Sequence, residues 1–336
     1  MAQRDTIVIG ASAGGVEALR SLLGGLPGDL PAAVLVVMHT PPSAINALAS
    51  ILRRSTSLVV RPAETDLRLE RGTVVVARPD HHLLLVDDHV ILTRGPRENG
   101  HRPAVDVLFR SAARAVGPRA IGVVLSGALD DGAAGLVALR SRGGLGVVQA
   151  PDDALHAGMP RSAIAAADPE HVVPVTEMAE VIAREVGVEV PDPAPTTPLM
   201  ETELAMAELE PHALNDPERP GTPAGLSCPD CHGTLFEIAE NGYLRYRCRV
   251  GHAWSQQSLL AENDAALEGA LWMALRSLEE KAALALSMAG RARDRDQPMT
   301  AARFEEQAAE STSAATLLRR MLMDGTGIVV TEEQGR

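Results

Sequence analysis

The chain has 336 residues, enough for one large domain and a smaller one. Its net charge of −13 and its 2% aromatic content argue against a nucleic-acid-binding protein, because such proteins need cationic side chains for phosphates and often aromatic rings for bases. No apolar run approaches the ~20 residues that span a bilayer, and no signal-like leader precedes the first predicted strand. We therefore expect a cytoplasmic protein that neither inserts into a membrane nor binds nucleic acid.

Residues 5–188 alternate short apolar runs with helix-like stretches, as is typical of a parallel sheet covered by helices. The predicted strands are 6–9, 34–38, 120–125 and 145–150, with further short strands in 72–77 and 82–92 that we expect to form an antiparallel excursion. The predicted helices are 16–23, 43–52, 103–116 and 133–140. The sequence thus predicts a doubly wound, mostly parallel α/β domain over residues 1–189.

A glycine-rich turn follows the first predicted strand. Residues 10–14 read Gly-Ala-Ser-Ala-Gly, the G-x-S-x-G pattern in which glycines permit a sharp strand-to-helix turn that exposes the serine hydroxyl. Backbone N–H groups at the start of the next helix would then point toward Ser12, where they could stabilise an oxyanion. Similar glycine turns bind nucleotide phosphates in other folds, so this stretch alone leaves both interpretations open.

Three predicted strands end near a polar side chain that could take part in hydrolysis, namely Ser12, His39 and Asp131. Open α/β sheets bind their ligands at the C-terminal ends of the strands. A hydrolytic serine needs a base within hydrogen-bond reach and a carboxylate that orients this base. His39 could instead bond a loop carbonyl, and Asp131 could cap the helix that begins at residue 133. The occurrence of all three at strand ends favours a catalytic group.

Five stretches together resemble the catalytic domain of the chemotaxis protein-glutamate methylesterase family (CheB-type). They are IGASAGG (9–15), VVMHTPP (36–42), HRPAVDVLFRSAA (101–113), LSGALDDGAAG (125–135) and GMPRSAI (158–164), in the order and at the spacing of that family. The resemblance implies that Ser12 is the nucleophile, His39 the general base and Asp131 the carboxylate that orients it. Asp130 is the alternative acid.

The resemblance also implies an oxyanion site made by backbone N–H groups, which we assign to Ala13 and Ala128. Ala13, Ala128 and Leu129 stand where many members have threonine, methionine and glycine. Backbone donors survive such changes, but Leu129 could alter the loop or narrow the cleft. Well-known members carry a receiver domain before the esterase, and we expect none here because the first strand begins within about ten residues of Met1.

The implied activity is hydrolysis of glutamate γ-methyl esters through an acyl-enzyme, with release of methanol and without a catalytic cofactor. A methylated chemoreceptor or another methylated signalling protein would be the partner, and amide hydrolysis at glutamine a secondary activity. For His101, Arg102 and Asp106 we favour a role in starting the following helix over a direct part in catalysis. Arg161 either helps to hold the cleft, or contacts an acidic receptor helix, or is an ordinary surface arginine.

The three cysteines lie within 21 residues and do not form a disulfide framework. Cys228-x2-Cys231 and Cys248-x3-His252 have the spacing of two ligand pairs for tetrahedral Zn²⁺. His232 is a competing fourth ligand with poorer reach, because it adjoins Cys231. Free thiols in a reduced cytoplasm are the alternative.

Residues 234–238 and 243–247 predict a hairpin that turns at Asn241-Gly242 between the two ligand pairs. This zinc-ribbon-like module, residues 227–255, is too small for a core of its own, so the zinc would be structural. Arginines at 245, 247 and 249 weakly favour nucleic-acid binding, and the acidic helices that follow oppose it.

The remaining segments are assigned from composition and periodicity. Residues 190–226 are rich in proline and acidic side chains and predict a linker with one short helix near 199–208. Residues 256–324 carry apolar side chains at helical spacing and predict an antiparallel helical hairpin, and 325–336 form a tail. We favour packing of this hairpin on itself or in a homodimer over docking on a helical receptor.

Two functions from different classes remain open. The first is the serine methylesterase described above. The second is a non-catalytic signalling module that uses the esterase fold, the zinc ribbon and the helical hairpin as docking surfaces. The presence of Ser12, His39 and Asp131 favours the esterase.

Overall fold

A computed structural model describes residues 2–215, 221–240 and 242–323. The contacts of the chain divide it into two compact units, Met1–Leu259 and Leu260–Arg336. Asn241 of the predicted hairpin turn and the predicted tail 325–336 lie outside the described residues.

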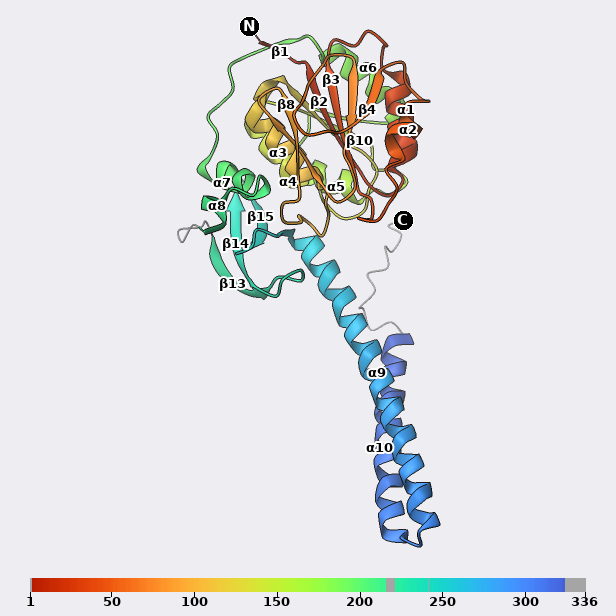
Figure 1. The fold of residues 1–336 in the computed structure, drawn as a ribbon. Coiled ribbons are helices and arrows are strands. Elements are labelled where there is room, and N and C mark those ends of the chain that lie inside the picture. Colours follow the sequence, from red (N-terminus) through yellow and green to blue (C-terminus); the bar gives the residue numbers. More distant parts are fainter. Residues whose placement is uncertain (1, 216–220, 241, 324–336) are drawn as a thin grey trace. The chain divides into compact units, whose positions relative to one another are not determined.

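A seven-stranded sheet forms the centre of the first unit (Figure 1). Its strand order is β11-β10-β9-β2-β3-β6-β4, and all neighbouring strands run parallel. The strands are β2 (Thr6–Ala11), β3 (Ala33–Met38), β4 (Val59–Pro62), β6 (Thr73–Val76), β9 (Ala120–Val124), β10 (Leu145–Gln149) and β11 (His171–Val173). Every residue of β2 is buried, because both faces of the sheet are covered.

Helices cover the two faces of this sheet, which confirms the predicted doubly wound arrangement. Those on one face are α1 (Gly15–Gly25), α2 (Leu48–Leu52) and α6 (Val175–Glu185). Those on the other face are α3 (Val105–Ala115), α4 (Ala133–Ser141) and α5 (Gly158–Ala167), with a 3-10 turn at Gly117–Arg119. Ile7 and Ile9 of β2 face the first group and Val8 faces the second, as the alternation of side chains along a strand requires.

The predicted antiparallel excursion is correct for only part of its length. The strands β7 (His82–Val86) and β8 (His89–Thr93) form a hairpin, with β5 (Leu67–Arg68) beside β8. By contrast, β6 runs parallel to β3 in the main sheet, since its valines are buried between the two helical layers. A separate pair, β1 (Ala2–Gln3) with β12 (Glu189–Val190), joins the two ends of the α/β domain.

The stretch 190–226, which we expected to be a linker, contains more regular structure than its composition suggests. It holds α7 (Pro198–Ala207), α8 (Pro211–Asn215) and the strand β13 (Thr222–Ser227). Thr197 caps α7 by accepting the N–H of Met200 at 3.1 Å. Met200 and Leu204 are buried in the core beside α3, so this helix belongs to the folded unit.

An antiparallel four-stranded sheet follows, in the order β13-β14-β15-β16. Its further strands are β14 (Thr234–Glu240), β15 (Tyr243–Cys248) and β16 (Ala253–Ser255). β14 and β15 pair as the sequence predicts. We call residues 222–255 the cysteine module, because they carry the three cysteines.

The described part of the second unit consists of two helices, α9 (Gln256–Asp294) and α10 (Pro298–Met323), and the short turn 295–297 between them. The first four residues of α9 belong to the first unit. Ion pairs join Arg293 to Glu305 near the turn and Arg319 to Glu279 further along, as in an antiparallel hairpin. Small side chains form the buried face of α10, namely Ala301, Ala308, Ser311 and Ala315. Within the described residues, none of the helices has the length and apolar character needed to cross a bilayer.

Candidate active site and cysteine cluster

Ser12 lies in the turn between β2 and α1. Gly14 caps α1 with a φ of 72°, a left-handed conformation that glycine adopts without strain. A Cβ on Gly10 would come within 2.2 Å of Val105 Cγ1, so glycine there lets α3 approach β2 closely. The N–H of Ser12 donates to the carbonyl of Ser126 at 2.9 Å, which fixes the turn against the strand end of β9.

The sheet order brings Ser12, His39 and Asp131 together. β2 lies between β3 and β9, so the residues that follow these three strands meet at one edge of the sheet. Ser12 Oγ is 3.1 Å from His39 Nδ1, and His39 Nε2 is 2.7 Å from Asp131 Oδ2. The carboxylate accepts the Nε2 proton, and this tautomer leaves the lone pair of Nδ1 free to accept the serine hydroxyl.

Asp131 is almost completely buried and is held by several donors besides His39. The backbone N–H groups of Val105 and Asp106, at the start of α3, donate to it at 2.7 and 3.2 Å, and Asn99 Nδ2 donates at 3.1 Å. Burial alone would raise the pKa of Asp131, but the hydrogen bond and electrostatic interaction with His39, the neighbouring His101 and the N–H of Val105 hold its pKa well below the usual range. The carboxylate is therefore ionised and suited to orient and stabilise an imidazolium.

Two neighbouring carboxyl groups have other partners. Asp106 Oδ1 accepts the N–H groups of Gly132 and Gly135 at 2.9 and 2.6 Å, so it supports the loop that carries Asp131 as well as beginning α3. Burial and the charge of Asp131 raise the pKa of Asp106. Asp130, the alternative acid, bonds hydroxyl groups of residues 243–258 instead of His39.

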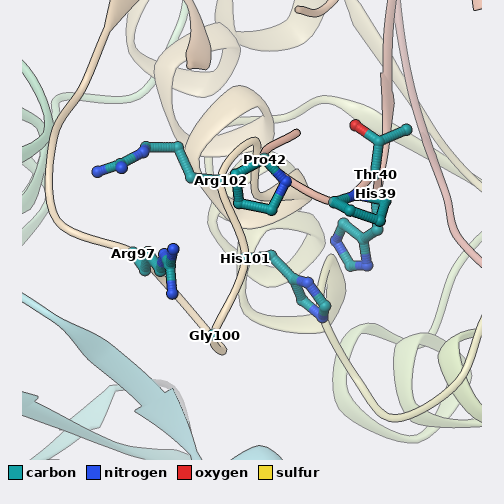
Figure 2. A pocket seen from close by; sticks show the side chains of 8 residues that line it. His39, Thr40, Pro42, Arg97, Gly100, His101 and Arg102 are labelled. Atoms are coloured by element: carbon teal, nitrogen blue, oxygen red, sulfur yellow. The ribbon is translucent and has the colours of Figure 1, made fainter. Parts of the chain in front are cut away.

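A pocket of about 310 Å³ opens beside His39 (Figure 2). It is lined by His39, Thr40, Pro41, Pro42, Arg97, Gly100, His101 and Arg102. The ring of His101 stacks on that of His39, with centroids 3.6 Å apart, and the two lie close together in Figure 2. Burial and then the neighbouring His39 lower the pKa of His101 to about 4, so this ring is neutral at pH 7. The sequence interpretation gave His101 only a role in starting the following helix. The structure shows that it also contacts the ring of His39.

The loop that contains the assigned donor Ala128 lies against Ser12. A Cβ added to Gly127 would come within 2.9 Å of Ser12 Cβ. Among the described residues, no acceptor bonds the backbone N–H of Ala13 or Ala128, as a pair of oxyanion donors requires. Leu129 has a φ of 59°, a left-handed conformation that glycine adopts with less strain than leucine.

The other residues singled out from the sequence are arginines outside the row of Ser12, His39 and Asp131. Arg102 bonds Asp80 at 2.6 Å at the rim of the pocket. Arg161 is exposed on α5. Arg245 and Arg247, considered as nucleic-acid contacts, are instead buried: both pair with Glu203, at 2.6 and 3.0 Å. Guanidinium groups held in this way do not provide a basic surface for phosphates.

The cysteine module brings together the side chains of Cys228, Cys231, Cys248 and His252, whose ligand atoms all lie within 4.8 Å of one another. His252 Nδ1 is 3.7 Å from Cys228 Sγ and 3.5 Å from Cys248 Sγ, and the sulfurs of Cys231 and Cys248 are 3.6 Å apart. Tetrahedral Zn²⁺ with bonds of 2.0–2.3 Å separates its ligand atoms by roughly 3.4–3.8 Å, so the donor set fits that ion. His232 is not part of this group.

Comparisons with known proteins identify the family to which the α/β domain is similar. The CheB methylesterase family model matches residues 7–182. The chain is 38% identical to protein-glutamate methylesterase/protein-glutamine glutaminase 2 of Methanosarcina mazei over 54% of its length and 52% of that protein. It is also 38% identical to a shorter Leptospira interrogans relative, of which it covers 94%.

The crystal structure of the Thermotoga maritima CheB methylesterase catalytic domain is similar as well, with 30% identity and a TM-score of 0.53. The similarity covers 55% of this chain and all of that domain. The chain spans about half the length of the first curated relatives it matches. The family model nevertheless matches residues 7–182, which is most of the α/β domain, and this chain belongs to the CheB methylesterase family.

Proposed function

We propose that this protein hydrolyses glutamate γ-methyl esters on a chemoreceptor-like or other methylated signalling protein and releases methanol. The observation that carries the proposal is the hydrogen-bonded row of Ser12, His39 and Asp131 at the ends of three neighbouring strands. The names of the methanosarcinal and leptospiral relatives support the same reaction class.

The first half of the reaction forms an acyl-enzyme. Ser12 Oγ attacks the ester carbonyl while His39 Nδ1 takes the hydroxyl proton, and Asp131 stabilises the resulting imidazolium. The backbone N–H groups of Ala13 and Ala128 hold the tetrahedral oxyanion. The intermediate collapses, the bond to the methoxy group breaks, and His39 gives its proton to the departing methanol.

The second half regenerates the serine. Water attacks the acyl carbonyl while His39 takes one proton from it, and the same proton returns to Ser12 Oγ as the glutamate leaves. A primary amide can follow the same path with ammonia as the leaving group, so glutamine deamidation is the secondary activity. The triad supplies nucleophile, base and orienting acid, and the proposal includes no catalytic cofactor.

The pocket suits a substrate that carries negative charge. Arg97 lines it with a partly exposed guanidinium group, and Arg161 lies exposed on α5. A receptor helix with several glutamates around the methylated one would meet these cations. We therefore propose that substrate selection depends on charge, and that a higher ionic strength weakens substrate binding and raises KM.

We further propose that Cys228, Cys231, Cys248 and His252 hold a structural Zn²⁺. The ion would link β15 and β16 to the turn before β14, in a module whose buried apolar cluster is small. No position in this donor set is assigned to substrate.

For the second unit we propose a homodimer through the helical hairpin in a cytoplasmic protein. Leu267, Trp272 and Met273 of α9 are 49–62% exposed, and a second copy of the hairpin would cover such side chains. Light scattering on the full chain and on a Trp272→Glu, Met273→Glu variant tests this: a dimer is expected for the first and a monomer for the second.

The esterase proposal is tested by methanol release from receptor membranes methylated beforehand with labelled methyl groups. We expect release by the wild-type chain, loss of at least about 10³-fold in Ser12→Ala, and an unchanged rate in the control Ser162→Ala, whose hydroxyl lies on α5. Equal release by wild type and Ser12→Ala, or none by either, would favour the non-catalytic signalling module.

A further inference from the structure

Asn99 connects the cysteine module to the proposed catalytic acid. Its side-chain Oδ1 accepts the backbone N–H of Ser255 at 2.8 Å. Its Nδ2 donates to Asp131 Oδ1 and to Asp106 Oδ2, both at 3.1 Å. Because the N–H of Ser255 needs an acceptor and the ionised Asp131 needs donors, these partners determine the orientation of the amide. One side chain thus bonds both regions.

The backbone around Asn99 is attached to the same strand. The N–H of Asn99 donates to the carbonyl of Ala253 at 2.8 Å, and the N–H of Ala253 donates to the carbonyl of Arg97 at 3.1 Å. Ala253 directly follows His252, one of the four clustered ligands. The place of Asn99 therefore depends on a strand that begins at the cysteine cluster.

Asp130 makes a second connection. Its Oδ1 accepts the hydroxyls of Ser255 and Ser258 at 2.6 and 2.8 Å, and its Oδ2 accepts the hydroxyl of Tyr243 at 3.1 Å. All three donors lie in the cysteine module or the first turn of α9. Asp130 directly precedes Asp131, so residues 243–258 hold the loop of the proposed catalytic acid.

Buried ion pairs anchor this contact. Glu98, next to Asn99, pairs with Arg247 at 2.9 Å and with Arg110 of α3 at 2.6 Å. Arg247 directly precedes Cys248 and also pairs with Glu203 of α7. These side chains are at most 5% exposed. Separating the module would leave buried charges without partners, which is strongly unfavourable.

We propose that the metal-bound cysteine module positions the catalytic carboxylate of the esterase, with Asn99 as the positioning residue between them. This inference rests on the proposed esterase function. Bound Zn²⁺ keeps the start of β16 in place, and β16 keeps Asn99 and Asp130 in place. When the metal is lost, Asp131 keeps its hydrogen bonds from the start of α3. It loses the support that Asn99 and Asp130 give it, and turnover falls.

Asn99→Ala tests the positioning role. We expect kcat to fall about 10- to 100-fold with KM changed less than about twofold, because the variant misplaces Asp131 without removing a group that lines the pocket. Ser162→Ala is the matched control, since Ser162 Oγ lies near Gln257 at the same contact but bonds no carboxylate. A kcat equal to that of wild type would overturn the positioning role, and so would a loss confined to KM.

The dependence on metal is tested by hydrogen exchange on the full chain, with bound zinc measured by atomic absorption before and after chelation. We expect removal of zinc to reduce protection of the peptide 126–136 in wild type, and to lower kcat less in Asn99→Ala than in wild type. Unchanged protection of this peptide after zinc removal would overturn the proposal. The exchange experiment needs no turnover, so failure of the esterase function alone would leave its result interpretable.

Discussion

The two polar centres of the first unit are assembled in opposite ways. The strand-end site consists of Ser12, His39 and Asp131, which the order of three parallel strands brings together. Ser12 and His39 are 27 residues apart in the sequence, and His39 and Asp131 are 92 residues apart. The cysteine cluster joins side chains from a stretch of only 25 residues, 228–252, on short turns of a small sheet. The first depends on the strand order of the complete α/β core, and the second depends on the local pairing of β14, β15 and β16.

This difference predicts different kinds of damage. Substitutions at the strand-end site should remove chemistry and leave a stable protein, because the sheet and its two helical layers are held by extensive apolar burial. Substitutions in the cluster should remove stability first, because its own apolar core is small.

The largest effect is expected for Asp131→Asn. This variant tests whether Asp131 or Asp130 is the carboxylate that orients His39. An amide at this position no longer favours the Nε2 proton on His39, so we expect kcat to fall about 10³- to 10⁴-fold. Asp130→Asn is the comparison variant. It should lose at most about 100-fold, and a larger loss there than in Asp131→Asn would assign the acid to Asp130.

Next in size is Cys248→Ser. Removing one of four ligands should lower bound zinc to well below one per chain and should cost on the order of 4 kcal/mol, out of the roughly 10–16 kcal/mol of a complete site. Calorimetry and metal analysis would measure this, with Ser227→Ala, at the end of β13, as a control. Retention of a full equivalent of zinc at unchanged stability would contradict the assigned ligands.

A smaller effect concerns pH and the scaffold of the strand-end site. Buried His82 donates from Nε2 to the carbonyl of Pro96 and accepts the N–H of Ala104 at Nδ1, so it must be neutral. Burial lowers the pKa of His82 to about 4, against about 6.5 in the unfolded chain. The unfolded chain therefore binds more protons between these values, and the free energy of unfolding decreases as the pH falls from 6.5 to 4.

Urea denaturation would measure this dependence. His82 alone should cost about 2 kcal/mol between pH 7 and pH 5, and His82→Gln should reduce the pH dependence by that amount. An unaltered pH dependence in His82→Gln would show that this histidine is not the source.

The smallest effect is expected for Leu129→Gly. Leu129 is 37% exposed and has a left-handed backbone, so glycine relieves strain and loses little burial. The relief of backbone strain, about 1 kcal/mol, exceeds the conformational entropy that glycine loses on folding by a few tenths of a kcal/mol. The Tm should therefore rise slightly. Leu129→Ala, which shortens the side chain but keeps the strain, should not be stabilised.

Much of the strand-end site could be predicted because its residues follow strands that are visible as apolar runs. The motif around Ser12 and the positions of His39 and Asp131 place three groups at strand ends, and the observed strand order makes these ends neighbours. The cysteine cluster was predictable from spacing alone, since ligand pairs on short turns leave a regular pattern.

Other features have no comparable signal in the sequence. Asn99 and His101 lie in the irregular segment 94–104, where no periodicity indicates what a side chain contacts. The composition of 190–226 suggested a linker because prolines and acidic residues are frequent in it, but Glu203 is buried in ion pairs with arginines. Such pairs join residues more than 40 positions apart, and only the folded chain shows them.

Labelling with a fluorophosphonate, followed by peptide mapping, tests the central claim most directly. This reagent reacts with serine hydroxyls that a neighbouring base activates. We expect one adduct, on Ser12, formed at least about 100-fold more slowly in His39→Gln. An adduct on a different serine, or labelling of Ser12 at the same rate without the imidazole of His39, would contradict the account.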